Sequence, residues 1–292
     1  MQGVLEIRRR IRSVREIHHI TRAMKMVAAT KIKYARERVE ASRPFARKIN
    51  EVLLDIYHLA GRVSGAGKLH PLMETRPPRK VALIVITSDR GLAGAYNSNI
   101  LRYTMAHIRN RADHPEFGII AVGRKGRDYF RRLNRQLLGE FIDAPEMASF
   151  ARAREIAAHV IPMFLRKEID EVDIIYSRFY SAHKQRPRLF RLLPIVPVEP
   201  AELQPLRAAW VFEPSPQDIL EHLIPRYIEA EIYRSLLEAA AGEQGARMTS
   251  MGAATDNAEK ILKELTLQYN HSRQSLITRE LTELMGGVEA QR

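Results

Sequence analysis

Helical periodicity at both ends of the chain constrains its fold more than any other feature of the sequence. From Leu5 to about Leu59, apolar residues recur at steps of three and four, the spacing of one helical face. We expect a kink or a join at Pro44, the only interruption. The first part of this stripe consists of Ile7, Ile11, Val14, Ile17, Ile20, Met24, Val27, Ala28, Ile32, Ala35 and Val39.

The last 70 or so residues show a second helical pattern. Ser215 is a suitable N-cap before Pro216, Pro225 should bend or restart the helix, and Gly286-Gly287 is a suitable end. Later apolar and small residues alternate at steps of three and four, as the seam of a coiled coil requires. These residues are Met251, Ala254, Ala258, Leu262, Leu265, Tyr269, Ser272 and Leu276.

Neither terminal helix buries its apolar stripe alone, and isolated helices are marginal in water. We therefore expect the two helices to pair antiparallel, outside the middle domain. Segments rich in Ala, Gly and Met favour a register in which Val27 lies near Gly252, since close helix approach needs small side chains. Counting then places Leu5 near Gln274, and the last dozen or so residues project as a single helix.

The middle of the chain has the sequence pattern of an α/β domain. Short β-branched or aromatic runs alternate with helical segments, which predicts a parallel sheet in a three-layered arrangement. The expected strands are 81–87, 117–123, 172–179 and 189–196, and the expected helices are 97–113, 124–134 and 149–166. The predicted domains are an N-terminal coiled-coil helix (1–60), a linker (61–79), the α/β domain (80–197), a connection or foot (198–215) and a C-terminal coiled-coil helix (216–292).

Composition narrows the class of protein. Hydrophobic residues make up 45% of the 292, enough for a real core, and the chain has no cysteine, which excludes disulfides, thiolate metal sites and a cysteine nucleophile. No apolar run approaches the ~20 residues of a membrane span, so we expect a soluble or peripheral protein. The net charge is +13, and residues 1–50 carry 14 Lys or Arg against four Glu. Such a segment faces nucleic acid, anionic lipid or an acidic protein surface, or is simply a solvated helix face.

Three motifs raise the question of chemistry, and each has a structural alternative. The turns Gly91–Gly94 and Gly123–Gly126 complete no phosphate-binding motif, and tight strand-to-helix turns need glycine anyway. Ser88 and Asp89 have no partners that complete a catalytic triad, so capping of the next helix is favoured. His18 and His19 are adjacent and point roughly 100° apart on a helix, which disfavours a shared metal. The sequence thus predicts no catalytic residue, no cofactor site and no metal site.

The polar C-terminal run 273–283 and the Asp256-Asn257 pair lie where a buried coil would have leucine. A helix end that is part apolar and part polar suits a partner surface that surrounds it without binding it tightly. The alternative is a frayed terminus, which the density of Leu and Ile disfavours.

Four motifs, in order along the whole chain, resemble one family. Ile11-Arg-Ser-Val with Ile20-Thr-Arg-Ala-Met-Lys-Met-Val-Ala-Ala-Thr-Lys31 resembles the N-terminal signature of the ATP synthase gamma subunit. Thr87-Ser-Asp-Arg-Gly-Leu-Ala-Gly94 resembles its central signature. Ala246-Arg-Met-Thr-Ser-Met-Gly-Ala-Ala-Thr-Asp-Asn257 and Arg273-Gln-Ser-Leu-Ile-Thr-Arg-Glu-Leu-Thr-Glu283 are similar to its C-terminal signature.

The resemblance implies a fold and a role. It implies a long antiparallel coiled coil of the N- and C-terminal helices plus a central Rossmann-like, three-layer α/β domain. The chain would be the central-stalk rotor of a proton-translocating F-type ATP synthase, without an active site. Its partners would be the alpha, beta and epsilon subunits and the c-ring, and not nucleic acid. Its place would be peripheral, on the cytoplasmic side of a bacterial cell membrane.

The resemblance also implies roles for residues that match the family's motifs. Contacts with the alpha/beta head fall on Met24, Lys25, Arg247, Arg273, Gln274, Thr278, Glu280 and Glu283, with an acidic loop of beta opposite the basic helix. Contacts of the foot with the c-ring and epsilon fall on Trp210, Phe212 and Glu213. Ala93 replaces a cysteine common in the central signature, and Lys25 and Arg279 stand where some relatives have an acid and a glutamine.

Two other classes of protein stay open on the residues alone. A nucleic-acid-binding protein with a basic coiled-coil arm fits the charge, although the arm has no aromatic residue for base stacking apart from Tyr34. A nucleotide-dependent enzyme in the α/β domain lacks its phosphate loop.

Overall fold

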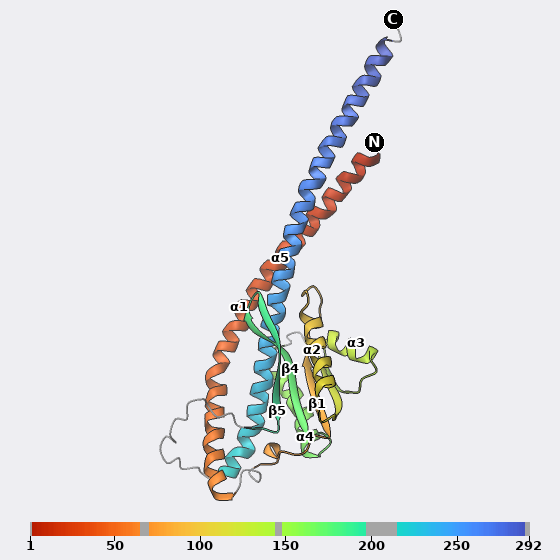
Figure 1. Ribbon diagram of the computed structural model, residues 1–292. Coiled ribbons are helices and arrows are strands. Elements are labelled where there is room, and N and C mark those ends of the chain that lie inside the picture. Colours follow the sequence, from red (N-terminus) through yellow and green to blue (C-terminus); the bar gives the residue numbers. More distant parts are fainter. Residues whose placement is uncertain (1, 65–69, 144–147, 197–214, 290–292) are drawn as a thin grey trace. The chain divides into compact units, whose positions relative to one another are not determined.

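The computed structural model describes residues 2–64, 70–143, 148–196 and 215–289. The chain divides into two compact units (Figure 1). Unit 1 consists of residues 1–29 and 247–292, and unit 2 consists of residues 30–246. Helices α1 (Gln2–Ser64) and α5 (Pro216–Glu289) each contribute to both units.

Unit 2 is built on a five-stranded sheet with the order β3-β2-β1-β4-β5. Strands β1 (Lys80–Ile86), β2 (Glu116–Val122), β3 (Leu137–Phe141) and β4 (Glu171–Ser181) are parallel, and β5 (Lys184–Leu193) pairs antiparallel with β4. Helices α2 (Tyr96–Asn110), α3 (Arg124–Arg132) and α4 (Phe150–Leu165) connect the strands, and a short 3₁₀ helix spans Pro71–Met73. The sheet is therefore mixed, and the prediction of a wholly parallel sheet is wrong for β5.

Two features of the sheet escaped the sequence prediction for local reasons. Strand β3 has no β-branched residue and contains Gly139, so it lacks a strand signal. The β4–β5 hairpin turns at Ala182-His183, where a two-residue turn would normally show Gly or Asn. Pro187 lies within β5, a strand at the edge of the sheet, where proline is tolerated.

The two faces of the sheet are covered by different helices. Alternate residues of β1 point to opposite faces, with Val81, Leu83 and Val85 packing against α2 and α3. Ala82, Ile84 and Ile86 belong to a larger core that includes residues of α4 and of the unit 2 parts of α1 and α5. The α1 and α5 members of that core are Val39, Ile49, Leu53, Ile56, Leu220, Ile224, Tyr227, Ile228, Ile232, Leu236, Leu237 and Ala239.

This packing corrects the prediction that the terminal helices pair outside the α/β domain over their whole length. Within unit 2, Leu53 and Ile56 are 1% and 0% exposed in the same core as the sheet residue Ile84. The apolar stripe of α1 thus serves the sheet in its second half. Periodicity shows that a helix has an apolar face but does not show what covers it.

Both long helices continue through their internal prolines. The helical assignment of α1 includes Pro44, and that of α5 includes Pro225 and runs past Gly286-Gly287 to Glu289. The predicted start of α5 is confirmed, because the backbone N–H of Asp218 donates to the Ser215 hydroxyl at 3.2 Å.

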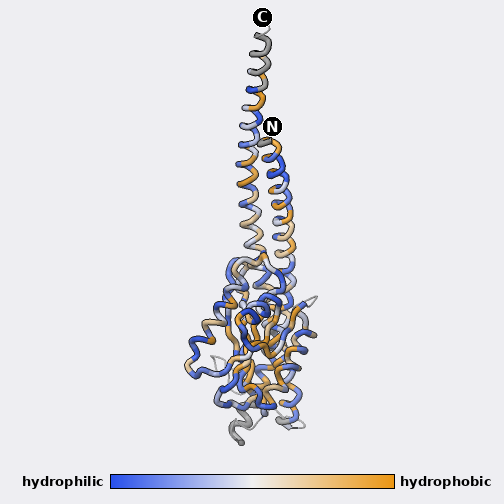
Figure 2. The backbone as a smooth tube through the Cα atoms, turned by 90° about the vertical axis from the view of Figure 1, so that its right-hand side faces the viewer, coloured by the Kyte–Doolittle hydropathy of each residue, from blue (hydrophilic) through white to orange (hydrophobic). Residues whose placement is uncertain are grey.

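In unit 1 the two ends of the chain lie side by side as antiparallel helices (Figures 1 and 2). Every residue of the predicted α5 seam, from Met251 to Leu276, is buried or half-buried. The facing residues of α1 are offset from the predicted register, because Lys25 and not Val27 lies against Gly252. Val27 is 56% exposed. Beyond the N-terminal end of α1, α5 continues alone, as predicted (Figure 2).

Candidate partner-contact surfaces

The residues assigned to the alpha/beta head fall into two groups along unit 1. Met24 is half-buried and Lys25 is exposed on α1, and the side chain of Lys25 lies along Gly252, where an added Cβ would be 3.7 Å from its Cε. Arg247 is only 9% exposed. Since Gly252 is little more than one turn beyond Arg247, these residues lie at similar heights along the pair of helices.

The second group lies about 30 Å further along α5, at a rise of 1.5 Å per residue. Arg273, Gln274 and Thr278 are exposed, and the Thr278 hydroxyl donates to the backbone carbonyl of Gln274 at 3.0 Å. Glu280 and Glu283 lie in the helix, and their side chains fall outside the described part of the structure. The foot residues Trp210, Phe212 and Glu213 also lie outside the described residues.

Large apolar side chains are exposed on both helices of unit 1. The hydrophobic positions of these helices are the orange segments among blue ones in Figure 2. On α1, Ile17, Ile20 and Met26 are 50%, 59% and 63% exposed, and on α5 Leu267 is 71% exposed. Other exposed apolar residues of this unit are Leu5, Val27, Ile261, Ile277, Leu281 and Met285. Exposed apolar residues in such density mark a protein–protein contact surface.

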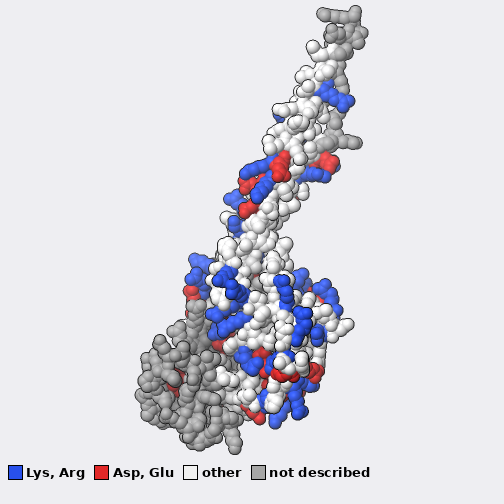
Figure 3. All heavy atoms as spheres, in the orientation of Figure 1, with Lys and Arg blue, Asp and Glu red and all other residues white. Residues whose placement is uncertain are grey.

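Charges of both signs accompany these apolar residues on unit 1 (Figure 3). Arg10 pairs with Glu6 at 3.0 Å and Lys263 with Glu259 at 3.1 Å, each pair one helical turn apart. Such exposed pairs contribute little to stability. They keep the surface of the helices solvated. The exposed apolar residues are therefore the side chains whose burial against a partner would be most favourable.

Two threonines of unit 1 were missed at the sequence level. Thr21 and Thr255 are each 9% exposed, and their Oγ1 atoms lie 2.9 Å apart across the two helices. Their signal was present, since both fall at the three-and-four spacing of the seam, but the predicted stripes contain only apolar and small residues. Ile17 and Ile20, which were included in the stripe, are exposed instead.

The glycine-rich turns of unit 2 are filled by the protein's own groups. The Asp89 carboxylate accepts the backbone N–H of Arg124 at 2.8 Å, and the Thr87 hydroxyl accepts that of Gly126 at 2.9 Å. The first amides of α3, which would otherwise attract a phosphate, therefore already have acceptors. The prediction that Ser88 and Asp89 cap the next helix, α2, is wrong: the N-cap of α2 is Ala95, and Asp89 accepts a backbone N–H at the start of α3 instead.

Gly123 shows how closely these segments approach. Its φ is +96°, and an added Cβ would lie 2.3 Å from the Thr87 carbonyl oxygen. Ser88 forms hydrogen bonds with the side chain of Asn97, including one from its backbone N–H at 3.0 Å. The turns are thus glycine-rich because the backbone packs tightly. The first backbone N–H groups of α3 are already hydrogen-bonded and do not form a binding site for the phosphates of a nucleotide.

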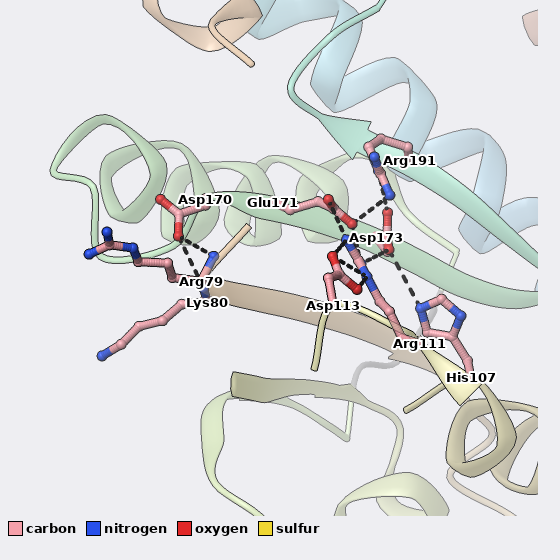
Figure 4. Close-up of polar contacts among 9 residues, drawn as sticks. All are labelled: Arg79, Lys80, His107, Arg111, Asp113, Asp170, Glu171, Asp173 and Arg191. Atoms are coloured by element: carbon pink, nitrogen blue, oxygen red, sulfur yellow. Dashed lines mark hydrogen bonds and ion pairs between the residues drawn. The ribbon is translucent and has the colours of Figure 1, made fainter. Parts of the chain in front are cut away.

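A network of charged residues joins α2 to the edge of the sheet in unit 2 (Figure 4). Arg111 donates to both carboxylate oxygens of Glu171, at 2.5 and 2.9 Å, and to Asp113. Arg191 bridges Glu171 and Asp173 from β5, at 2.5 and 3.0 Å. Nearby, the Asp170 carboxylate accepts the backbone N–H groups of residues 79 and 80 at 3.0 Å and so ties the start of β4 to the start of β1.

This network holds three carboxylates against two guanidinium groups, and the surplus falls on Asp173. Asp173 is fully buried, and its Oδ2 has no hydrogen-bond partner among the described residues. The Nε2 of His107 lies 3.8 Å from that oxygen. Burial raises the pKa of Asp173 to about 6, the Glu171 carboxylate adds to the rise, and Arg191 opposes it. Burial lowers the pKa of His107, and the charge of Arg111 lowers it further.

The chemistry of this network is structural. Both guanidinium groups are held by carboxylates, so neither is free to bind an anionic substrate. No nucleophile and no glycine-rich phosphate cradle lies among the residues drawn in Figure 4. Over the ranges that the structure describes, no group of three or more His, Cys, Asp or Glu could hold a metal ion. Likewise, no described helix is both long enough and apolar enough to span a membrane.

Comparisons with known proteins agree with the fold. The sequence model of a family described as ATP synthase matches residues 3–291. The ATP synthase gamma chains of Heliobacterium modesticaldum and Desulfitobacterium hafniense are 43% and 44% identical to this chain, over 99% of each chain. The chain therefore belongs to the ATP synthase family, as one of its gamma chains. It is accordingly a rotor subunit of the central stalk and a non-catalytic part of the synthase.

Solved structures give the same fold. A chain from the Tetrahymena thermophila mitochondrial ATP synthase, in a structure of its central stalk and c-ring, is 27% identical with a TM-score of 0.59. The match covers 80% of this chain and 99% of that chain. A chain of the Euglena gracilis mitochondrial ATP synthase reaches a TM-score of 0.69 at 19% identity, over 99% and 95% of the two chains.

Proposed function

We propose that this chain turns with a c-ring and couples proton flow through the membrane to ATP synthesis in a head of alpha and beta subunits. The observation that carries the proposal is the two-helix unit 1, whose outward surface is rich in exposed apolar residues, in a chain that matches ATP synthase gamma chains over its full length. A pair of helices that buries only its own seam needs an outer partner to cover that surface.

Contacts with the head are assigned first to Met24, Lys25 and Arg247. The excess of basic residues in the first 50 supports an acidic loop of a beta subunit as the opposite surface. Lys25 is exposed, and its side chain extends across α5 at Gly252, so its ammonium group is available at the surface. The half-buried Met24 adds an adaptable apolar contact beside it.

The far end of α5 is assigned to a bearing, by which we mean an apolar surface of the alpha and beta subunits that surrounds this helix end while it turns. Arg273, Gln274 and Thr278 are exposed, and Ile277 and Leu281 are 45% and 58% exposed on the same helix. A surface of mixed apolar and polar residues allows close contact with the head without binding so tightly that rotation stops. Glu280 and Glu283 complete this group by their match to the family's motif.

The foot is assigned to Trp210, Phe212 and Glu213, on the family resemblance alone, with the c-ring and the epsilon subunit as partners. In this arrangement the protein is peripheral to the bacterial cell membrane, on its cytoplasmic side. The bacterial origin of the relatives supports that location.

The mechanism requires that the rotor contact each beta subunit differently. A ligand or partner shifts a conformational equilibrium only by its difference in affinity for the two states. Unit 1 provides such a difference, because its apolar and charged side chains do not repeat around the two helices: exposed Ile17 and Ile20 lie on α1, whereas Leu267 lies on α5. Rotation then presents a different surface to each catalytic site in turn.

The test is reconstitution of the full chain with alpha and beta subunits. We expect a stable complex whose ATPase activity requires this chain, and no ATP hydrolysis by the chain alone. Lys25→Glu should weaken the complex or its activity, whereas Lys31→Glu, which changes the net charge equally, should have a smaller effect. ATP hydrolysis by the isolated chain, or salt-dependent binding to RNA in place of complex formation, would overturn the proposal.

A further inference from the structure

The hydrogen-bonded pair of Thr21 and Thr255 is a polar feature in the seam between the two helices of unit 1. Their Oγ1 atoms lie 2.9 Å apart. The hydroxyl of Thr21 also donates to the carbonyl of His18 at 3.1 Å, and that of Thr255 lies 2.7 Å from the carbonyl of Met251. Two hydroxyl hydrogens thus serve three contacts, and no buried donor is left without an acceptor.

The residues on either side of the pair fit this register by size. Counting along both helices from the threonine pair places His18 level with Ala258, which is 4% exposed, and the electrostatic effect of His18 on the neighbouring Glu259 agrees with that level. The same count places the small, buried Ala28 level with the larger Met248. Large side chains therefore face small ones on both sides of the threonines.

A slip of one heptad would disturb all of these relationships. Since a seven-residue repeat preserves the general pattern of the seam, it is the nearest competing register. It would place His18 level with Leu265 and Ala28 level with Thr255, which gives crowding at one level and a gap at the other. It would also place Thr21 level with a leucine and remove the hydrogen bond between the helices.

We propose that Thr21 and Thr255 are positioning residues that fix the register of the two helices in unit 1. The register determines that Met24 and Lys25 are held about one turn from the level of Arg247. A heptad slip would move one set past the other by about 10 Å. The consequence for coupling to a catalytic head rests on the proposed function, whereas the register itself is a property of the isolated chain.

The register can be measured by disulfide formation, because the chain contains no cysteine of its own. One double variant, V14C with L262C, joins positions that are level in the observed register. A second, V14C with Y269C, joins positions that become level only after a heptad slip. In the isolated full-length chain under mild oxidation, we expect the first pair to form a disulfide and the second to remain reduced.

Thr21→Val and Thr255→Val together should raise the disulfide yield of the second pair about fivefold, the factor to which the loss of one neutral hydrogen bond corresponds. The matched control is Thr266→Val, because Thr266 is exposed on the same helix and its hydroxyl contacts only the carbonyl of Leu262 on its own turn among the contacts observed. That control should leave both yields unchanged. Thr21→Ser with Thr255→Ser, which keeps both hydroxyls, should restore the original pattern.

An unchanged yield of the second pair in the double valine variant, with helix content retained by circular dichroism, would overturn the proposal. If the double valine variant loses its helix content, Thr255→Val alone decides the matter in the same assay. Failure of the chain to assemble with alpha and beta subunits would count against the proposed function and leave the measured register untouched. The two proposals can therefore fail separately.

Discussion

The hydroxyl of Tyr96, at the start of α2, donates a hydrogen bond to the backbone carbonyl of Ala239 in α5 at 3.0 Å, although 143 residues separate them. Tyr96 is 5% exposed and Ala239 is 2% exposed, so water does not replace this bond. Nearby, an added Cβ at Gly242 would lie 3.5 Å from the Tyr96 ring. This contact fastens α5 to the α/β unit, close to the strand end where ligands bind in many related folds.

Tyr96→Phe should therefore destabilise unit 2 by about 1 kcal/mol, the net contribution of one buried neutral hydrogen bond. The ring keeps its packing, so the change isolates the hydroxyl. Urea unfolding followed by circular dichroism measures the effect as a lower midpoint with an unchanged slope. The control is Tyr103→Phe, because Tyr103 is 38% exposed on the same helix and should change stability little. Equal effects of the two substitutions would contradict the role assigned to this bond.

Gly123→Ala should be far more damaging than Gly91→Ala, although both glycines lie in strand-to-helix turns. A Cβ at Gly123 would meet the Thr87 carbonyl at 2.3 Å, on a backbone with φ of +96°, whereas a Cβ at Gly91 would have no atom within 4 Å. We expect a loss of about 2–4 kcal/mol for Gly123→Ala. Gly91→Ala should be nearly neutral. Thermal unfolding of both variants provides the comparison, and a stable Gly123→Ala chain would show that the turn relaxes.

The sequence predicted the elements of unit 2 well because their signals are local. Runs such as Val81–Ile86 are apolar on both faces, as buried strands must be. The predicted coiled-coil seam was equally local in origin. A strand was predicted at 189–196, where β5 lies, but its antiparallel pairing with β4 was missed because the turn between the two strands, Ala182-His183, has no residue that marks a turn.

The sequence could not show which surface covers each part of the two apolar stripes. The stripe of α1 continues from Ile7 to Ile56, yet the sheet of unit 2 is covered by its second half. The register was offset because small residues limit how closely helices approach without fixing their level, whereas the hydrogen bond between Thr21 and Thr255 involves two residues 234 positions apart. Family resemblance named contact residues but gave no geometry for them.

The charge network at Asp173 predicts a specific dependence of stability on pH. Its pKa is raised from 3.8 to about 6 in the folded chain, so the folded state binds more protons between these values. The stability contributed by the protonated group is present below pH 3.8 and is lost as the pH rises through about 6. This loss is on the order of 3 kcal/mol. Burial also raises the pKa of Glu231, which contributes with the same sign.

Asp173→Asn should remove this component, because an amide of the same shape has no charge to bury. The difference in unfolding free energy between the variant and the parent should therefore grow from pH 4 to pH 6.5 in favour of the variant. Asp113→Asn is the contrasting variant: hydrogen bonding to Arg111 lowers the pKa of Asp113, so its contribution is present above its unfolded pKa and lost as the pH falls. Parallel pH profiles for the parent and Asp173→Asn would contradict the assignment.

Deletion of residues 273–292 separates the folding of the chain from its action on a partner. In unit 1, α5 continues alone beyond the N-terminal end of α1 (Figure 2), and counting from the threonine pair places Gln274 level with Gln2, so few of the deleted helical positions lie beside α1. We expect the truncated chain to keep its unfolding temperature within about 3 °C, because little buried apolar surface is removed. The reconstituted complex should assemble more weakly and turn with lower torque, since Arg273, Gln274 and Thr278 are lost from the proposed bearing.

A shorter deletion, of residues 286–292, is the control for this experiment, because it shortens the same helix and leaves every assigned contact residue in place. Single-molecule rotation of the two reconstituted complexes provides the measurement. Full torque from the chain that lacks residues 273–292 would remove the bearing assignment while leaving the contacts of Met24, Lys25 and Arg247 to transmit the force. A large fall in the unfolding temperature of that chain would instead show that the end of α5 stabilises the pair of helices, because lost torque would then follow from lost structure.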